Sequence, residues 1–296
     1  MSRPRRSPRR QLLRGAAAAA GALALAACGG GAHGGSFLRR HYRELSADDK
    51  RRLFAALEAD AYARTGVRVT IGDPPPVPGV HFAQGLGLTR CIGCRRCVAA
   101  CARESNCSRD PQIQYIRVLE LDRGSFDLGR ASAYYDRPAV PAEGKIYLPV
   151  SCHQCANPPC VRACPVQATW VEPDGIVVVD YDWCIGCRYC QAACPYWARR
   201  FNFAEPTVPP DEITPAQGYL SSRLRPVGVV EKCSFCLHRT RVGSYPACVE
   251  ACPTGARKFG DLGDPRGELR RTIERKRILV LKEELGTLPR FFYYFD

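Results

Sequence analysis

The sequence predicts an α+β protein built of short strands, short helices and loops. Eighteen of its 296 residues are cysteines, and sixteen of them fall into four groups of four. Strands are expected between and beyond these groups, at residues 113–121, 145–150, 176–179 and 278–281. The length allows one large or two modest domains, and the composition, 46% hydrophobic and 24% charged, is ordinary for a globular protein.

Two of the cysteine groups follow the spacing C-x2-C-x2-C-x3-C of bacterial ferredoxins. The first group is Cys91, Cys94, Cys97 and Cys101, and the third is Cys184, Cys187, Cys190 and Cys194. Three thiolates on a tight loop can wrap one face of a cubane, while the fourth, on the helical turn that follows, points to a neighbouring cluster. Gly93 and Gly186 are expected to let the backbone approach the cluster.

The other two groups keep the ligand set but lengthen the loop between the second and third cysteines. The second group is Cys152, Cys155, Cys160 and Cys164, and the fourth is Cys233, Cys236, Cys248 and Cys252. Proline follows the last cysteine of groups two to four and is expected to end a short helix there. Ala102 follows Cys101 and departs from that pattern.

Zinc and disulfide bonds are the alternatives for so many cysteines. Zinc sites combine two separated C-x2-C pairs, and three cysteines within seven residues fit that arrangement poorly. Disulfides are the stronger rival, since exported cysteine-rich proteins usually form them. Four repeats of one ligand pattern favour iron-sulfur clusters, so the sequence predicts four 4Fe-4S clusters. Cys107 stands outside the groups and is expected to be a buried or free thiol.

The N-terminus resembles an export signal. Residues 1–27 contain six arginines and no acid, followed by an Ala-rich apolar stretch that is short for a membrane span. Residues 8–14 resemble a twin-arginine signal, and residues 25–28 resemble a lipobox, which makes Cys28 a lipidation site. Residues 28–45 would form a tether, residues 46–87 a helical extension with a Pro-rich linker, and residues 88–296 the cluster-binding domain.

The net charge of +14 does not indicate nucleic-acid binding. Six positive charges lie in the predicted signal, which leaves 14 − 6 = +8 for the remaining chain. Four oxidised clusters would contribute about −2 each and bring the folded protein near neutrality. Basic residues near the cysteines are therefore interpreted as counter-charges, namely Arg95, Arg96, Arg188, Lys232, Arg239 and Arg241.

From about residue 88 to residue 296, the chain resembles the iron-sulfur electron-transfer subunits of dimethyl sulfoxide reductase and polysulfide reductase complexes, and the NrfC protein of nitrite reduction. Besides the four cysteine groups, the resemblance includes residues 180–183, 194–202 and 246–256. It implies tandem ferredoxin-like cluster-binding folds with long loop insertions and an N-terminal helical extension.

The resemblance also implies that ligands pair across the groups, first with fourth and second with third. Four ligand sets result: Cys91, Cys94, Cys97 and Cys252 (cluster 1); Cys233, Cys236, Cys248 and Cys101 (cluster 2); Cys152, Cys155, Cys160 and Cys194 (cluster 3); and Cys184, Cys187, Cys190 and Cys164 (cluster 4). Every ligand position in the four sets is a cysteine, so His153 is not expected to bind iron. It is expected to be a loop residue or to form a hydrogen bond to a cluster sulfide.

The implied function is electron transfer in an exported, membrane-associated respiratory complex. The expected partners are an integral membrane quinone-reactive subunit and a molybdopterin-type catalytic or multihaem cytochrome subunit, with attachment to the periplasmic side of the membrane through lipid and partner. A self-contained reductase acting on a small molecule at one cluster is the alternative, but it would need an iron atom with a vacant coordination position. A redox-sensing or structural cluster protein is a third possibility. No nucleophile or nicotinamide motif accompanies the cysteines, so no catalytic residue is expected.

Two remaining segments carry structural predictions. Residues 46–64 read as one amphipathic helix with Leu53, Phe54, Leu57 and Tyr62 on its apolar face, expected to pack against the same chain. The aromatic end at residues 289–296 is expected to be a final strand or a partner contact. Because loops and clusters fill the interior, little room is expected for a conventional hydrophobic core.

Overall fold

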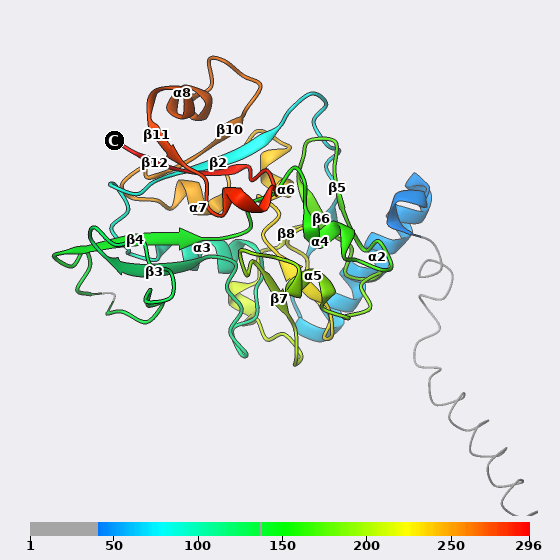
Figure 1. The fold of residues 1–296 in the computed structure, drawn as a ribbon. Helices are drawn as coiled ribbons and strands as arrows, with labels where there is room; N and C mark the ends of the chain where they lie inside the picture. Colours follow the sequence, from blue (N-terminus) through cyan, green and yellow to red (C-terminus); the bar gives the residue numbers. More distant parts are fainter. Residues whose placement is uncertain (1–40, 137) are drawn as a thin grey trace, which may run out of the picture.

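The computed structural model describes residues 41–136 and 138–296. The predicted export signal, Cys28 and most of the tether lie outside these described residues. Within them the fold is mixed α+β, as expected, with short helices and small sheets (Figure 1). No helix in this part of the chain combines the length and the apolar character needed to cross a bilayer.

The helical elements are η1 (Tyr42–Glu44), α2 (Ala47–Thr65), α3 (Arg96–Glu104), α4 (Pro159–Arg162), α5 (Tyr189–Ala192), η2 (Pro210–Glu212), α6 (Leu237–Thr240), α7 (Ala247–Glu250), α8 (Glu268–Arg275) and η3 (Glu283–Leu285). The strands are β1 (Thr70–Gly72), β2 (Phe82–Gly87), β3 (Arg117–Asp122), β4 (Lys145–Val150), β5 (Thr169–Val171), β6 (Val177–Val179), β7 (Arg199–Phe201), β8 (Ala216–Gly218), β9 (Val230–Lys232), β10 (Arg257–Asp261), β11 (Arg277–Leu279) and β12 (Phe291–Phe295). All four predicted strands are present, displaced by up to four residues, and the aromatic end forms β12.

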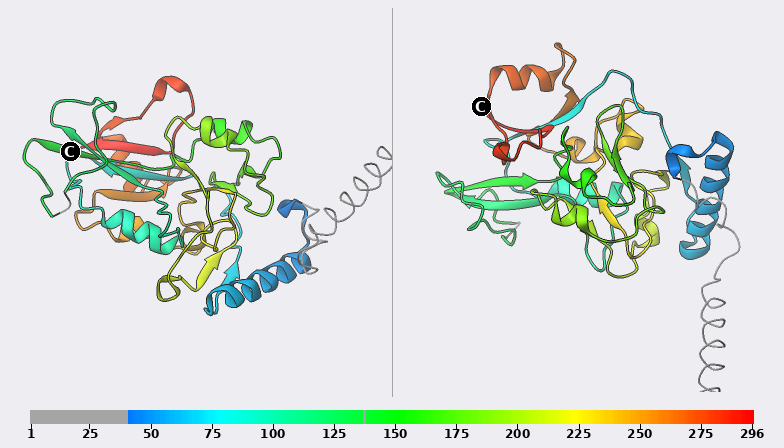
Figure 2. Two further views of the ribbon diagram at one scale, coloured as in Figure 1. Left: turned by 90° about the horizontal axis from the view of Figure 1, so that it is seen from below. Right: turned by 45° about the vertical axis from the view of Figure 1, so that its right-hand side comes forward.

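Helix α2 lies along the outside of the body, where Figure 2 shows it from two further directions. The side chain of Ser46 accepts a hydrogen bond from the Asp49 backbone N–H and caps its start. Leu53, Phe54 and Leu57 pack against the core, so the predicted packing against the same chain is confirmed. Tyr62 was wrongly placed on that face, since its side chain is half exposed and Ala61 is buried instead.

The four cysteine groups share one local architecture, in which a strand enters each group and a short helix leaves it. The entering strands are β2, β4, β6 and β9, and the helices that follow are α3, α4, α5 and α7. The strand after each group pairs with the strand entering the next, giving the antiparallel pairs β3–β4, β5–β6 and β7–β9. Strand β10, after the fourth group, pairs with β2, which enters the first. The strand pairing therefore closes a ring through all four groups.

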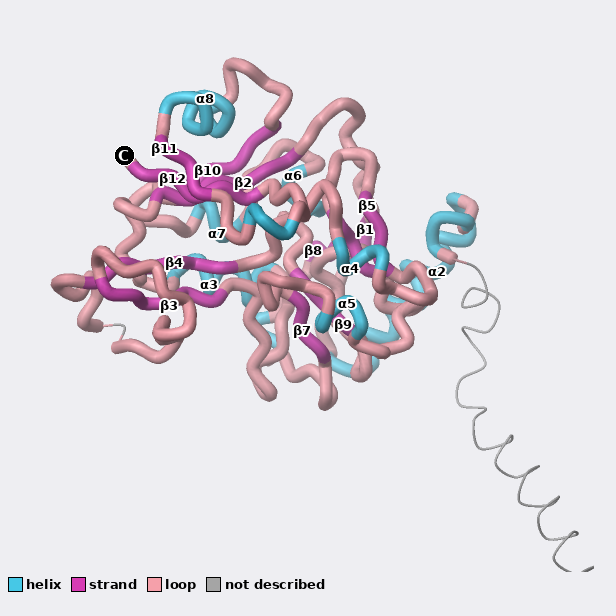
Figure 3. The backbone as a smooth tube through the Cα atoms, in the orientation of Figure 1, coloured by secondary structure: helices cyan, strands magenta, loops and turns pink. Residues whose placement is uncertain are grey.

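The largest sheet has the strand order β10-β2-β12-β11 and lies to one side of the molecule, above the long β3–β4 hairpin in the view of Figure 3. Strand β12 is parallel to β2 and antiparallel to β11. The C-terminal strand thus lies between an N-terminal strand and a C-terminal one, which ties the two ends of the cluster-binding region together.

The expectation of little conventional core is wrong. Two large clusters of buried apolar side chains lie among the described residues, one beneath α2 and one beside the largest sheet. Several cysteines belong to the second cluster, including Cys152 and Cys155. Short elements achieve this burial because strands and helices from distant parts of the sequence converge on the cysteine loops.

Candidate metal centres

The cysteine loops repeat one backbone feature. The residue before the second cysteine of each group has a left-handed conformation, and φ is +73° at Gly93, +45° at Gln154, +71° at Gly186 and +54° at Phe235. This conformation turns the loop sharply between the first and second thiols. Glycine adopts it without strain, whereas other residues do so at a cost.

The two glycines are needed for a second reason that differs from the predicted one. A Cβ at Gly93 would lie 2.5 Å from the ring of Tyr147, and one at Gly186 would lie 2.2 Å from the carbonyl oxygen of Gly228. Protein atoms therefore crowd both positions before any cluster is considered. Sequence reasoning recognised the close approach but not these neighbours.

The structure brings the first and fourth cysteine groups together. Helices α3 and α7 pack against each other, and one cavity is lined by three thiols of the first group and the last thiol of the fourth: Cys91, Cys94, Cys97 and Cys252. The last thiol of the first group, Cys101, lies in turn among the first three thiols of the fourth group: Cys233, Cys236 and Cys248.

The second and third groups also come together. A second cavity is lined by Cys152, Cys155 and Cys160 of the second group and by Cys194 of the third. Helices α4 and α5 pack against each other; Cys164 follows the first of them and Cys187 precedes the second. Cys190 lies near Cys184. Among the sixteen grouped cysteines, all of which are in the described part, Cys187 alone is exposed.

The environment of eight of the sixteen grouped thiols disfavours a free thiolate, because burial raises the pKa of each. Burial raises the pKa of Cys91 to about 11 and those of Cys155 and Cys233 to about 12. Burial likewise places the pKa of Cys101 far above its usual value. At Cys252 burial also acts to raise the pKa, but hydrogen bonds from the backbone at Arg257 and the side chain of Thr254 outweigh it and lower the pKa.

These features fit a bound iron-sulfur cluster. Buried thiolates become favourable when they bind a metal centre, and four thiols around one cavity are the ligand set that a cubane requires. All seventeen cysteines in residues 41–136 and 138–296 are free thiols. No three His, Cys, Asp or Glu side chains in that part are arranged to hold a single metal ion; the four thiols of a cubane bind four separate irons and stand further apart.

Family comparisons agree with this chemistry. A model described as a 4Fe-4S dicluster domain matches residues 144–208 and 219–262, and a 4Fe-4S binding domain matches residues 88–104. Over 214 residues the chain is 43% identical to a Halobacterium salinarum protein that is named as an iron-sulfur subunit of dimethyl sulfoxide reductase, covering 72% of this chain and 78% of the relative.

Two further relatives are reductase subunits from other organisms. A tetrathionate reductase subunit of Salmonella typhimurium is 38% identical over 73% of each protein, and a polysulfide reductase subunit of Wolinella succinogenes is 37% identical over 68% of this chain and 87% of the relative. This chain therefore belongs to their family. The relatives are iron-sulfur electron-transfer subunits of membrane-associated respiratory reductases, so membership of this family confirms the resemblance described from the sequence.

Two side chains near the cysteines have clear positions in this family member. His153 is buried and stacked on Tyr196, with ring centroids 3.9 Å apart, and both of its ring nitrogens lack a hydrogen-bond partner among the described residues. Burial lowers its pKa to about 3, so the ring is neutral.

Cys107 is fully buried and its pKa is raised to about 12, first by burial and then by nearby Glu231. It is therefore an unreactive thiol.

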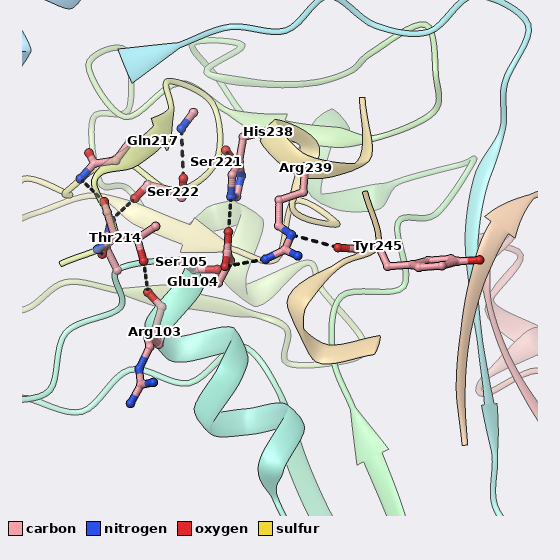
Figure 4. A network of polar contacts seen from close by, with 12 residues as sticks. Arg103, Glu104, Ser105, Thr214, Gln217, Ser221, Ser222, His238, Arg239 and Tyr245 are labelled. Atoms are coloured by element: carbon pink, nitrogen blue, oxygen red, sulfur yellow. Dashed lines mark hydrogen bonds and ion pairs between the residues drawn. The ribbon is translucent and has the colours of Figure 1, made fainter. Parts of the chain in front are cut away.

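A polar network links the first group to the insertion in the fourth (Figure 4). Glu104, at the end of α3, contacts His238 Nε2 at 2.8 Å and Arg239 Nη1 at 2.9 Å, both on α6. The hydrogen bond from His238 lowers the pKa of Glu104; burial opposes this, and the charge of Arg239 adds to the lowering. The opposite ring nitrogen of His238 lies 2.9 Å from the hydroxyl of Ser221. The inserted residues 237–247 are thus held against the helix that carries Cys97 and Cys101.

The predicted counter-charges include two that already have acidic partners. Arg239 binds Glu104 and Glu250, and Arg241 binds Asp174 and Glu172. Sequence reasoning missed Arg199 and Arg257, two buried arginines that touch cysteines. The available signal was their position, since each stands five residues after the last cysteine of its group.

Proposed function

We propose that this subunit relays electrons through four 4Fe-4S clusters held by crossed pairs of cysteine groups. The observation that carries the proposal is the composition of the two cavities, each lined by three thiols of one group and the last thiol of its partner group. The proposed ligands are Cys91, Cys94, Cys97 and Cys252 for cluster 1; Cys233, Cys236, Cys248 and Cys101 for cluster 2; Cys152, Cys155, Cys160 and Cys194 for cluster 3; and Cys184, Cys187, Cys190 and Cys164 for cluster 4.

The positions of the thiols support a linear order of clusters from 1 to 4. Clusters 1 and 2 share the first and fourth groups, and clusters 3 and 4 share the second and third. The two halves come together at Cys233 of cluster 2 and Cys152 of cluster 3, where burial and then the neighbouring Cys152 raise the pKa of Cys233. When bound, the clusters accept and pass on single electrons; the chain spaces them, excludes water and adjusts their potentials.

Cluster 4 is the proposed point of contact with one partner. Cys187 is exposed, and apolar side chains around the third group are exposed with it: Ile185 by 63%, Tyr189 by 64% and Phe203 by 68%. Large apolar side chains gathered at the surface are typical of protein interfaces. The partners that we propose are an integral membrane quinone-reactive subunit and a molybdopterin-type catalytic or multihaem cytochrome subunit, one for each end of the relay.

The ligand assignment is tested by comparing Cys164→Ser with Cys160→Ser in the purified chain. Although these residues belong to the same sequence group, the first substitution should alter cluster 4 and the second cluster 3. Redox-poised electron paramagnetic resonance should therefore show two different altered signals, against an unaltered set for Cys107→Ser. Loss of the same signal in both variants would contradict the crossed pairing.

The relay itself is tested in membranes that contain the whole complex. Quinol, or a reductant of the catalytic partner, should reduce the clusters rapidly. Clusters that neither donor reduces would refute electron relay, and catalytic reduction of a small molecule by the purified chain without partners would favour the alternative of a self-contained reductase.

We further propose that residues 1–27 are a twin-arginine-type lipoprotein signal and that Cys28 is lipidated on the periplasmic side of the membrane. The support is the sequence pattern described above. One lipid anchor binds membranes only weakly, so a partner must contribute to attachment. Cys28→Ala should release the chain from membranes of cells lacking the partner subunits; undiminished binding there would refute lipidation.

A further inference from the structure

Three buried cationic side chains lie beside the cysteines without an acidic partner. Arg199, Lys232 and Arg257 are 1%, 2% and 4% exposed. None of the ion pairs found in residues 41–136 and 138–296 includes any of the three. An unpaired buried charge is very unfavourable unless an opposite charge offsets it. Their surroundings must therefore supply negative charge from another source.

Other buried arginines of the same chain show the usual arrangement. Arg225 lies 3.0 Å from Glu231, Arg223 lies 3.0 Å from Asp182, and Arg241 lies 2.7 Å from Asp174. Each of these guanidinium groups has a carboxylate of its own. These three buried arginines are neutralised by acids, whereas no acid among the described residues neutralises Arg199, Lys232 or Arg257.

Arg257 lies where the ligand sets of clusters 1 and 2 meet. Arg257 lines the same cavity as Cys91, Cys97 and Cys252, and its guanidinium lies close to both Cys97 and Cys248. Cys97 belongs to the set of cluster 1 and Cys248 to that of cluster 2. Both terminal nitrogens of Arg257 are buried and lack a hydrogen-bond partner among the described residues, so they remain available to cluster sulfides.

Arg199 occupies the corresponding place between the sets of clusters 3 and 4. Its Nη2 donates to the thiol of Cys160 at 3.1 Å and to the hydroxyl of Thr169 at 2.9 Å. Arg199 lines the cavity of the cluster 3 set and also lies close to Cys190. Cys160 belongs to the set of cluster 3 and Cys190 to that of cluster 4. Within the described residues, Nε and Nη1 of Arg199 have no partner.

Lys232 lies at the junction of the two halves. It is paired with Arg199 in the register of β7 and β9, and its Nζ binds only backbone carbonyls of the described residues, including that of Cys233 at 2.7 Å. Cys233 of the cluster 2 set neighbours Cys152 of the cluster 3 set. A buried cation is therefore found at each of the three junctions along the proposed order of clusters.

We propose that Arg257, Lys232 and Arg199 are fixed counter-charges at the three junctions between successive clusters, and that each raises the reduction potential of the two clusters beside it. The inference rests on the proposed four-cluster relay. Reduction adds one electron to a cluster whose charge is already negative. A buried cation nearby stabilises that added charge strongly, because little water is present to screen it.

The test is potentiometric, with Arg257→Gln and Arg199→Gln in the purified holoprotein. At a fixed poise near each midpoint, the reduced-to-oxidised ratio of the two adjacent clusters should fall about tenfold, which for a one-electron couple equals about 59 mV. Arg257→Gln should affect clusters 1 and 2, and Arg199→Gln clusters 3 and 4. Lys232→Gln should affect clusters 2 and 3.

The double variant Arg223→Gln/Asp182→Asn is the matched control, because Arg223 is as deeply buried and its removal together with Asp182 leaves the net charge of the site unchanged; the potentials of all four clusters should stay unchanged. Arg257→Lys and Arg199→Lys keep the positive charge. In these variants the reduced-to-oxidised ratio at the same poise should stay within about twofold of its value in the unmodified chain. Unchanged ratios in the glutamine variants, or equal shifts of all four clusters, would overturn the proposal.

Iron content decides the case in which a glutamine variant loses a cluster. If the lysine variant at the same position keeps the full iron content, the site requires the positive charge, which supports the proposal. If both variants lose the cluster, the site requires the shape of the arginine side chain, which overturns the proposal. Iron and sulfide counts of the unmodified chain distinguish this outcome from failure of the relay itself, since fewer than four clusters there would refute the assignment independently of any arginine.

Discussion

Substitution of Glu104 by glutamine should loosen the insertion that separates Cys236 from Cys248. Glu104 is 16% exposed and contacts both His238 and Arg239 of α6. Charge-assisted hydrogen bonds contribute roughly 1.5–3 kcal/mol each, and glutamine retains part of this bonding. We therefore expect Glu104→Gln to lower the free energy of local opening by about 2 kcal/mol.

Hydrogen exchange at α6 measures this opening directly. The amides of Thr240 and Arg241 donate to the carbonyls of Cys236 and Leu237, so they exchange when α6 opens. A loss of about 2 kcal/mol corresponds to roughly thirtyfold faster exchange. Glu250→Gln is the control, because Glu250 is 47% exposed and contacts the same Arg239; it should change the rate by no more than about twofold.

The pH dependence gives a second check on the same network. The pKa of Glu104 is lowered from its ordinary value of 4.5, so the carboxylate contributes fully above that pH and its contribution disappears as the pH falls through the lowered pKa. The difference between the variant and the unmodified chain should shrink in that acidic range. Equal exchange rates for both chains at neutral pH, or equal effects of the two substitutions, would refute this account of the network.

Further predictions concern the loops and the core. Gly186→Ala should reduce the amount of bound iron, because a Cβ there would lie 2.2 Å from the Gly228 carbonyl oxygen. Gly228→Ala is the control: its φ is similarly positive, but a Cβ there meets open space, so this variant should retain its iron. Equal iron content in the two variants would contradict the steric argument. Asp174→Asn should lower stability by about 3 kcal/mol in thermal unfolding, because it leaves buried Arg241 with Glu172 alone. Asp122→Asn, which removes an exposed contact with Lys145, should leave the melting temperature unchanged, and a similar loss in both would count against burial as the cause.

Local patterns were sufficient to predict several features. The apolar spacing of Leu53, Phe54 and Leu57 predicted a helix over residues 46–64, within one residue of α2 at each end. The β4 strand was predicted with its observed bounds. Both depend on neighbours in the sequence. The wrong placement of Tyr62 has the same origin, since a phenol can occupy either edge of an apolar face and only the packed structure selects Ala61.

Features that depend on distant contacts could not be predicted from local patterns. The β12–β2 pairing joins residues about two hundred positions apart, and the sequence carries no register signal for it. The lack of an acid near Arg257 among the described residues is likewise a property of the packed interior. Spacing alone indicated four ligands per group, but the sharing of ligands between groups came from resemblance, and the two cavities now give it a physical basis.

The closed ring of strand pairs also constrains the order in which the protein can mature. The second and third groups and the other residues that line their shared cavity lie within residues 152–199, so this cavity can form once that stretch has been synthesised. The cavity lined by Cys91 and Cys252, by contrast, needs β10 against β2. Under the proposed assignment, cluster 1 can therefore be loaded with iron only when β10 has been synthesised. A chain that stopped before β10 would therefore lack this cavity as well as the pairing of β12 with β2.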